Sequence, residues 1–129
     1  MFTLEEAGEA LPEVRRLVGQ IVELVQMLPE LQDQARIHAY QASRSDGQAG
    51  HHEELELSRA GLRDAELSLQ RALGELEALG VVMKDAQQGL VDFPSYRDGE
   101  LVELCWKMGE DRIAHWHRIG EGFAGRKPL

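Results

Sequence analysis

Apolar residues spaced alternately by three and four recur through two long stretches of the chain. The first series consists of Leu11, Val14, Val18, Ile21, Val25 and Leu28, flanked at intervals of seven by Leu17, Leu24 and Leu31. The second series consists of Leu55, Ser58, Leu62, Ala65, Leu69, Ala72, Leu76 and Leu79. This spacing predicts two amphipathic helices. The second alternates leucine with mostly small residues, which let a partner helix approach closely.

The boundaries of these helices follow from local signals. Residues 43–50 contain two glycines and no apolar periodicity, which predicts a reversal of direction and hence an antiparallel hairpin. The second helix is expected over residues 52–79, ended by Gly80.

Two signals divide the N-terminal segment. Thr3 and Glu6 have the spacing of a capping box, which predicts a short helix over residues 4–10. Pro12 has no amide hydrogen and suits a first turn, so a separate, longer helix is expected over about 13–43, bent near Pro29.

After Gly80 the pattern becomes that of strands. Residues 90–93 and 100–106 are rich in β-branched and aromatic side chains, and Asp98-Gly99 between them is a two-residue hairpin signal. With residues 113–117 they predict an antiparallel meander of about three strands. Such a small sheet needs a cover on one face.

The alternation within 100–106 assigns the two faces of that sheet. Val102, Leu104 and Trp106 share one face and are expected to lie on the helices. The opposite positions, Leu101, Glu103 and Cys105, are expected to point outward. The predicted class is α+β, a long antiparallel helical hairpin with a small C-terminal β-meander.

A length of 129 residues favours one domain over residues 1–129, with the hairpin in 1–80 and the meander and tail in 81–129. The net charge is −9 at pH 7, of which residues 1–80 carry −8 and residues 81–129 only −1. A field of that sign repels phosphate backbones and anionic lipids, so neither nucleic acid nor a membrane surface is expected as a partner.

Cysteine use and the terminal segment bear on the compartment. Cys105 is the only cysteine and cannot form an internal disulfide, and next to Trp106 it is expected to be a buried, inert thiol. The N-terminal residues lack the basic end and apolar run of a signal peptide, and no stretch is long enough to span a bilayer. We therefore expect a cytoplasmic protein.

Several short strings together resemble an uncharacterised bacterial family, domain of unknown function 2203. The strings are FTLEEA at 2–7, LPEV at 11–14, GLVDFP at 89–94, LCW at 104–106, GE at 109–110, WH at 116–117 and GFAGR at 122–126. The resemblance covers nearly the whole chain. It implies no activity, substrate or catalytic residue.

Common catalytic and cofactor motifs are not found. Gly120 to Gly125 spells G-x-G-x-x-G, but a dinucleotide site needs this turn to open a helix inside a βαβ unit, and only four residues follow. His51 and His52 fall in the predicted connection and are expected to be solvated loop residues, with a metal role as the alternative.

Polar residues concentrate in the last 45 residues: Asp85, Asp92, Glu110, His115, His117 and Arg126. His115 and His117 alternate on one strand face, so they could offer two imidazoles to a divalent metal, with Asp92 or Glu110 completing the site. A second hypothesis groups Asp92, Glu110, His117 and Arg126 around the polar part of a ligand, with Arg126 meeting an anionic group. The alternative is a solvated strand face whose acids satisfy turn amides.

Three functional classes remain open. Two helices bury only their facing seams, so apolar residues outside the main columns, such as Val22, Leu57 and Leu67, need another surface. We therefore expect first a non-catalytic binding or scaffold protein that acts as a homodimer, and that can bind a protein partner. A small-ligand or metal-binding protein using the C-terminal polar cluster is the alternative, and catalysis there is the third class.

Overall fold

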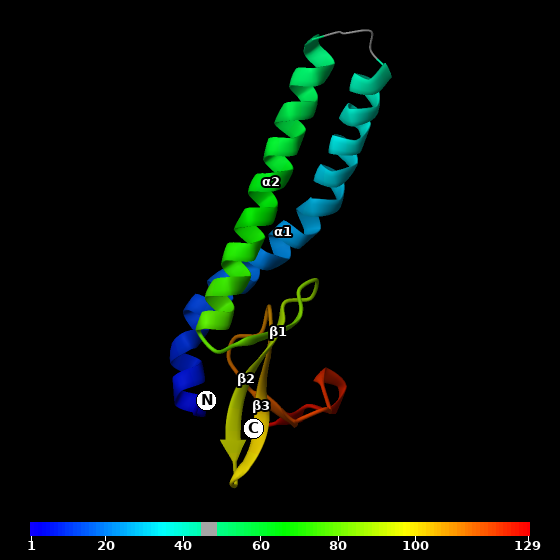
Figure 1. Cartoon of the computed structure of the whole chain (residues 1–129). Helices are drawn as coiled ribbons and strands as arrows, with labels where there is room; N and C mark the ends of the chain where they lie inside the picture. Colours follow the sequence, from blue (N-terminus) through cyan, green and yellow to red (C-terminus); the bar gives the residue numbers. More distant parts are fainter. Residues whose placement is uncertain (45–48) are drawn as a thin grey trace.

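The computed structural model describes residues 1–44 and 49–129. Two helices, α1 (Leu4–Arg44) and α2 (Ala49–Ala78), form the predicted antiparallel hairpin. Half of the predicted connection at 43–50, namely residues 45–48, lies outside the described residues. A sheet packs against the end of the hairpin where α1 begins and α2 ends, and the rest of the hairpin extends beyond it (Figure 1).

Helix α1 is continuous, so the predicted break between a short and a long N-terminal helix is wrong. Pro12 and Pro29 both lie inside α1, which is bent along its path in Figure 1. Ala7, Leu11 and Val14 form one buried stripe that passes Pro12 on the opposite face. Because this stripe packs into the core without interruption, tertiary burial holds the helix together across an exposed proline that local propensity would use as a boundary.

The capping box that starts α1 is confirmed. The Glu6 amide donates to Thr3 Oγ1 at 3.0 Å, and the Thr3 amide donates to Glu6 Oε1 at 2.9 Å. At the start of α2 the expectation was wrong, because His51 and His52 lie in the first turns of the helix and not in a loop.

Five strands follow in an antiparallel meander, in the order β1-β2-β3-β4-β5. They are β1 (Val82–Asp85), β2 (Leu90–Arg97), β3 (Glu100–Lys107), β4 (His115–Arg118) and β5 (Lys127–Pro128). The three predicted strands correspond to β2, β3 and β4. The two short edge strands, β1 and β5, were not predicted.

The hairpin turn between β2 and β3 lies where Asp98-Gly99 predicts it. Both residues have positive φ, 54° and 78°, as a two-residue turn between twisted strands requires. This turn sets the register of β2 and β3: Arg97 pairs with Glu100 next to the turn, and Val91 pairs with Trp106 six residues away from it on each strand.

The inner face of the sheet forms a common core with the helices, as predicted. Trp106, Val102 and Leu104 are buried in one cluster with Leu17 and Ile21 of α1. The Trp106 indole N–H also donates to the Glu110 carbonyl at 3.0 Å, so its polar atom is satisfied.

Leu101, Glu103 and Cys105 lie on the outer face of the sheet, and the burial expected of the Cys105 thiol is confirmed. Leu101 is exposed, but Glu103 and Cys105 are buried. The C-terminal tail ends in β5 at the edge of the sheet, and before it Gly120, Gly122 and Phe123 line a cavity over this face. The short 3₁₀ helix in this tail, η1 (Phe123–Gly125), lies beside the sheet (Figure 1). The sheet is therefore covered on both sides, and its outer face becomes a second, polar interior.

Candidate functional site

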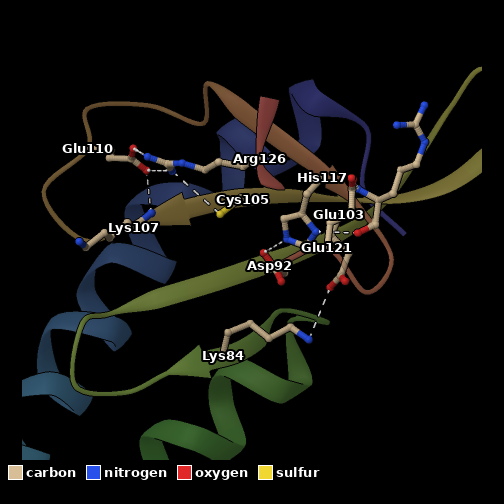
Figure 2. A network of polar contacts seen from close by, with 10 residues as sticks. Lys84, Asp92, Glu103, Cys105, Lys107, Glu110, His117, Glu121 and Arg126 are labelled. Carbon is tan, nitrogen blue, oxygen red and sulfur yellow. Dashed lines mark hydrogen bonds and ion pairs between the residues drawn. The ribbon is translucent and has the colours of Figure 1, made fainter. Parts of the chain in front are cut away.

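A network of polar side chains occupies the covered outer face of the sheet (Figure 2). Three adjacent strands each contribute one residue at its centre: Asp92 from β2, Cys105 from β3 and His117 from β4. Asp92 is the direct cross-strand partner of Cys105, and β4 lies on the other side of β3. Because side chains alternate along a strand, this register puts all three on the same face.

Asp92 and His117 form a buried contact. Asp92 Oδ1 lies 3.1 Å from His117 Nε2, and both side chains are 2% exposed. The other ring nitrogen, Nδ1, lies 2.9 Å from the Arg118 carbonyl oxygen. A carbonyl only accepts, so Nδ1 carries a hydrogen and donates to it. The ring is thereby oriented with Nε2 toward the carboxylate.

This orientation is favourable only if a proton or a metal cation lies between His117 Nε2 and the Asp92 carboxylate. If Nδ1 alone carried a hydrogen, Nε2 would present a lone pair to a carboxylate oxygen, which is also an acceptor. Burial lowers the pKa of His117, but its hydrogen bonds to Arg118 and Asp92 outweigh burial and the pKa lies above the ordinary value. A proton can therefore occupy the contact, and so can a metal cation.

Glu103 adds a second carboxylate beside this pair. It is 8% exposed and is paired across the strands with His117. Burial, followed by the charge of Asp92, raises the pKa of Glu103, while Lys84 at 3.9 Å and His117 act in the opposite direction. Two carboxylates held close together in a buried site repel each other, and a cation relieves that repulsion.

Cys105 lies between this group and a second one. Burial raises the pKa of its thiol to about 11, with the charge of Asp92 as the next cause. The Nη1 atom of Arg126 lies 4.0 Å from Sγ. The thiol is therefore protonated at neutral pH and is not poised as a free nucleophile.

The second group joins Glu110, Arg126 and Lys107. Arg126 donates through Nη1 and Nη2 to the two carboxylate oxygens of Glu110, at 3.1 and 2.8 Å. The Lys107 amide donates to Glu110 Oε1 at 2.8 Å. Burial raises the pKa of Glu110, but the bonds from Arg126 and Lys107 outweigh it and the pKa lies below its ordinary value. His115 Nδ1 lies 3.9 Å from Glu110 Oε2 and has no hydrogen-bond partner among the residues that the structure describes.

The predicted site residues thus divide into two adjoining groups. Asp92 lies with His117, and Glu110 lies with Arg126 and His115. Arg126 uses its two terminal nitrogens on Glu110, where the ligand hypothesis has it meeting an anionic group. Asp85 lies outside both groups, because its Oδ1 accepts the amides of Gln87 and Gln88 in the turn after β1.

Sequence reasoning left out Cys105 and Glu103 as members of the site. Their location on β3 was predicted, and the two-residue turn at Asp98-Gly99 already implies that Asp92 pairs with Cys105. That register was the available signal for a shared location. No comparable signal existed for β4, because a longer connection separates it from β3.

A cavity of about 290 Å³ opens beside this group. It is lined by Lys84, Leu90, Asp92, Glu103, His117, Gly120, Gly122 and Phe123. The segment that spells G-x-G-x-x-G thus supplies part of the cavity wall through Gly120, Gly122 and Phe123. It lies in a turn and a 3₁₀ helix, not at the start of an α-helix inside a βαβ unit.

These features define a class of protein: a helical hairpin joined to a five-stranded meander whose outer face holds a buried polar network. The chain belongs to the family described as uncharacterized conserved protein DUF2203, whose model matches residues 1–129. Searches of curated proteins and of solved structures found no match. In the part of the chain that the structure describes, neither helix is long and apolar enough to cross a membrane.

Proposed function

We propose that this chain is a non-catalytic binding or scaffold protein that acts as a homodimer through the distal half of its helical hairpin. The observation that carries the proposal is a change in burial along one apolar seam. In the proximal half, Val14, Leu17, Val18 and Ile21 are completely buried. In the distal half the corresponding positions, Leu28, Leu31, Leu55 and Leu62, are only half-buried.

The physical cause is the missing third layer. The sheet and α2 together cover the proximal half of α1, whereas the distal half of α1 packs against α2 alone (Figure 1). Val22 of α1 is buried because the chain at Gly89, just before β2, lies against it. Leu57 and Leu67 remain 70% and 54% exposed, and both lie outside the groove that we propose as the interface.

A groove in the distal half fits a second copy of the hairpin. It is lined by Gln32, Ala35, Arg36, Ala39, Arg59 and Leu62. Ala35 and Ala39 are small and one turn apart, which lets another helix approach closely. Arg36 and Arg59 border the groove, so an acidic helix such as those of this chain meets positive charge there.

The available area is sufficient for a dimer. Twenty residues of distal helix rise about 30 Å, and two helices side by side are about 20 Å wide. Such a face buries about 600 Å² on each copy, or about 1,200 Å² in total, above the roughly 1,000 Å² expected of a specific interface. Pairing of two hairpins into four helices would cover the half-buried seam.

Sedimentation at micromolar concentration tests this proposal, with an expected mass about twice the 14.5 kDa of the chain. Ala39→Glu introduces a charge into the groove and should give the monomer. Leu67→Glu is the matched control, because Leu67 is exposed outside the groove, and it should remain dimeric. Circular dichroism confirms that both variants keep their helices. A monomeric parent, or a dimeric Ala39→Glu variant, would overturn the proposal.

A second candidate function is the binding of a small ligand or metal ion at the outer face of the sheet. The buried Asp92–His117 pair beside a cavity favours it. We infer a cytoplasmic setting for either function, supported by a lone, buried cysteine that has no partner for an internal disulfide. The bacterial origin that the sequence resemblance implies remains part of this proposal.

A further inference from the structure

We propose that Asp92, Cys105 and His117 form a zinc site, with the fourth coordination position open toward the cavity on the outer face. This inference deepens the second candidate function and does not depend on pairing of the hairpins. One ligand atom from each of the three residues lies within 4.8 Å of the other two, and all three residues are buried. Among the described residues, this is the one group of three or more histidine, cysteine or acidic side chains with this spacing.

The spacing suits a small tetrahedral ion. Zinc lies about 2.3 Å from a thiolate sulfur and about 2.0–2.2 Å from imidazole nitrogen or carboxylate oxygen. Ligand atoms around it are then separated by roughly 3.5 Å. A contraction of about 1 Å, within the reach of side-chain rotation, closes the present arrangement around an ion.

His117 is already oriented as metal-binding histidines are. Its Nδ1–H donates to a backbone carbonyl, so the neutral ring presents its lone pair at Nε2. That lone pair points at a carboxylate, an arrangement that is unfavourable unless a proton or a cation lies between them. Zinc at this position accepts both groups.

The donor set selects the kind of ion. Thiolate and imidazole favour zinc over magnesium or calcium, which take oxygen ligands. The charges also balance: thiolate and carboxylate carry two negative charges, and the neutral imidazole adds none. On binding, two protons leave for solvent, one from Cys105 Sγ and one from the His117–Asp92 contact. The buried site is therefore neutral before and after binding, so the ion adds no uncompensated charge to the interior.

The neighbouring groups complete the site without supplying ligands. Arg126 lies 4.0 Å from Sγ and is held by both oxygens of Glu110, so it can approach and stabilise a thiolate. Glu103 and Lys84 line the cavity, where a water molecule can take the fourth position. Arg126 is thus a positioning residue for the thiolate.

Zinc titration of untagged protein, stripped with a chelator, tests the proposal. We expect one zinc per chain by elemental analysis after dialysis. Cobalt in its place should give the charge-transfer band of a cobalt–thiolate bond. Cys105→Ser and His117→Gln should each weaken zinc binding by more than about 100-fold, and Cys105→Ser should abolish the band.

His115→Gln is the matched control, because it removes an imidazole from the same strand face without removing a proposed ligand. It should bind zinc as the parent does. Circular dichroism of the metal-free proteins separates lost binding from lost folding. If zinc persists in Cys105→Ser and disappears in His115→Gln, the site is instead centred on Glu110. If the parent binds no zinc, the Asp92–His117 contact is a buried ion pair only, and the proposal fails.

Arg126→Lys probes the positioning role. This variant keeps the positive charge but loses the planar pairing with Glu110. We expect a roughly tenfold weaker zinc affinity and a shifted cobalt–thiolate band. A band that stays unchanged would exclude any action of Arg126 on the sulfur.

Discussion

Gly89, just before β2, lies close to Val18 and Val22 of α1, and Gly89→Ala tests that packing directly. Its φ is +71°, a conformation that costs a residue with a side chain about 1–2 kcal/mol. An added Cβ would lie 2.7 Å from Met108 Cβ, 3.0 Å from Val18 Cγ1 and 3.3 Å from Val22 Cγ2. The first of these contacts is shorter than any real Cβ tolerates, so the backbone at the start of β2 must shift.

The expected loss of unfolding free energy in Gly89→Ala has one contribution from backbone strain and one from packing. Overpacking of this kind costs about 1–3 kcal/mol. Alanine also lowers the conformational entropy of the unfolded chain, which offsets about 0.4–1 kcal/mol of that cost. We therefore expect Gly89→Ala to lower the free energy of unfolding by about 1–4.5 kcal/mol, with a midpoint near 3 kcal/mol, a large share of the stability of a domain this size.

Two other glycines isolate these parts. Gly99 has φ +78° but nothing within 4 Å of an added Cβ, so Gly99→Ala carries the backbone cost alone, about 1 kcal/mol. Gly74 lies inside α2 with open space around it, so Gly74→Ala should stabilise the protein by about 0.5–1 kcal/mol.

Urea unfolding followed by tryptophan fluorescence and circular dichroism, at one fixed protein concentration, measures all three variants. The reasoning is refuted if Gly89→Ala and Gly99→Ala lie within 0.5 kcal/mol of each other. That result would mean that the contact between sheet and α1 is loose enough to accept a methyl group.

Two further predictions concern the sheet and the tail. Trp106→Ala should lower the free energy of unfolding by about 3–5 kcal/mol, because the buried indole is lost from the shared core and the Glu110 carbonyl loses its donor; a change below half a kcal/mol in urea midpoints would contradict this packing. Glu110→Gln should cost about 1 kcal/mol at pH 7 after allowance for solvent screening of the pair with Arg126. The pKa of Glu110 is lowered on folding, so its stabilisation is complete above the ordinary value of 4.5 and is lost as pH falls through the lower folded value. The stability difference between parent and Glu110→Gln should therefore shrink below pH 4.5, and a difference that is constant with pH would exclude the ion pair as its source.

The helices and the central strands could be predicted because their signals are local. A spacing of three and four, a capping box at Thr3 and a turn at Asp98-Gly99 each act within a few residues, and the structure contains all three features. The edge strands had no such signal. β1 and β5 are four and two residues long, and they exist because the neighbouring strands offer unpaired backbone groups.

The candidate site was predicted only in part. Its histidines and acids were recognisable from their concentration after residue 81, and Asp92 and His117 do meet. Cys105 was left out of the predicted site because its thiol was expected to be buried and inert, and Glu103 was left out because it was expected to point outward. Burial of the outer face depends on where the tail from Gly120 onward folds, and no periodic pattern in so short a segment indicates it.

The sequence by itself determined the class of fold, the pairing of β2 with β3 and the face on which Trp106 packs, since each follows from backbone geometry and side-chain periodicity over short distances. Tertiary structure decided whether α1 continues past Pro12, because burial of Ala7, Leu11 and Val14 outweighs the local preference for a break. It also decided the chemistry of the outer face. Only when the tail excludes water do Asp92, Cys105 and His117 become buried neighbours, and contacts between strands so distant along the chain depend on global packing.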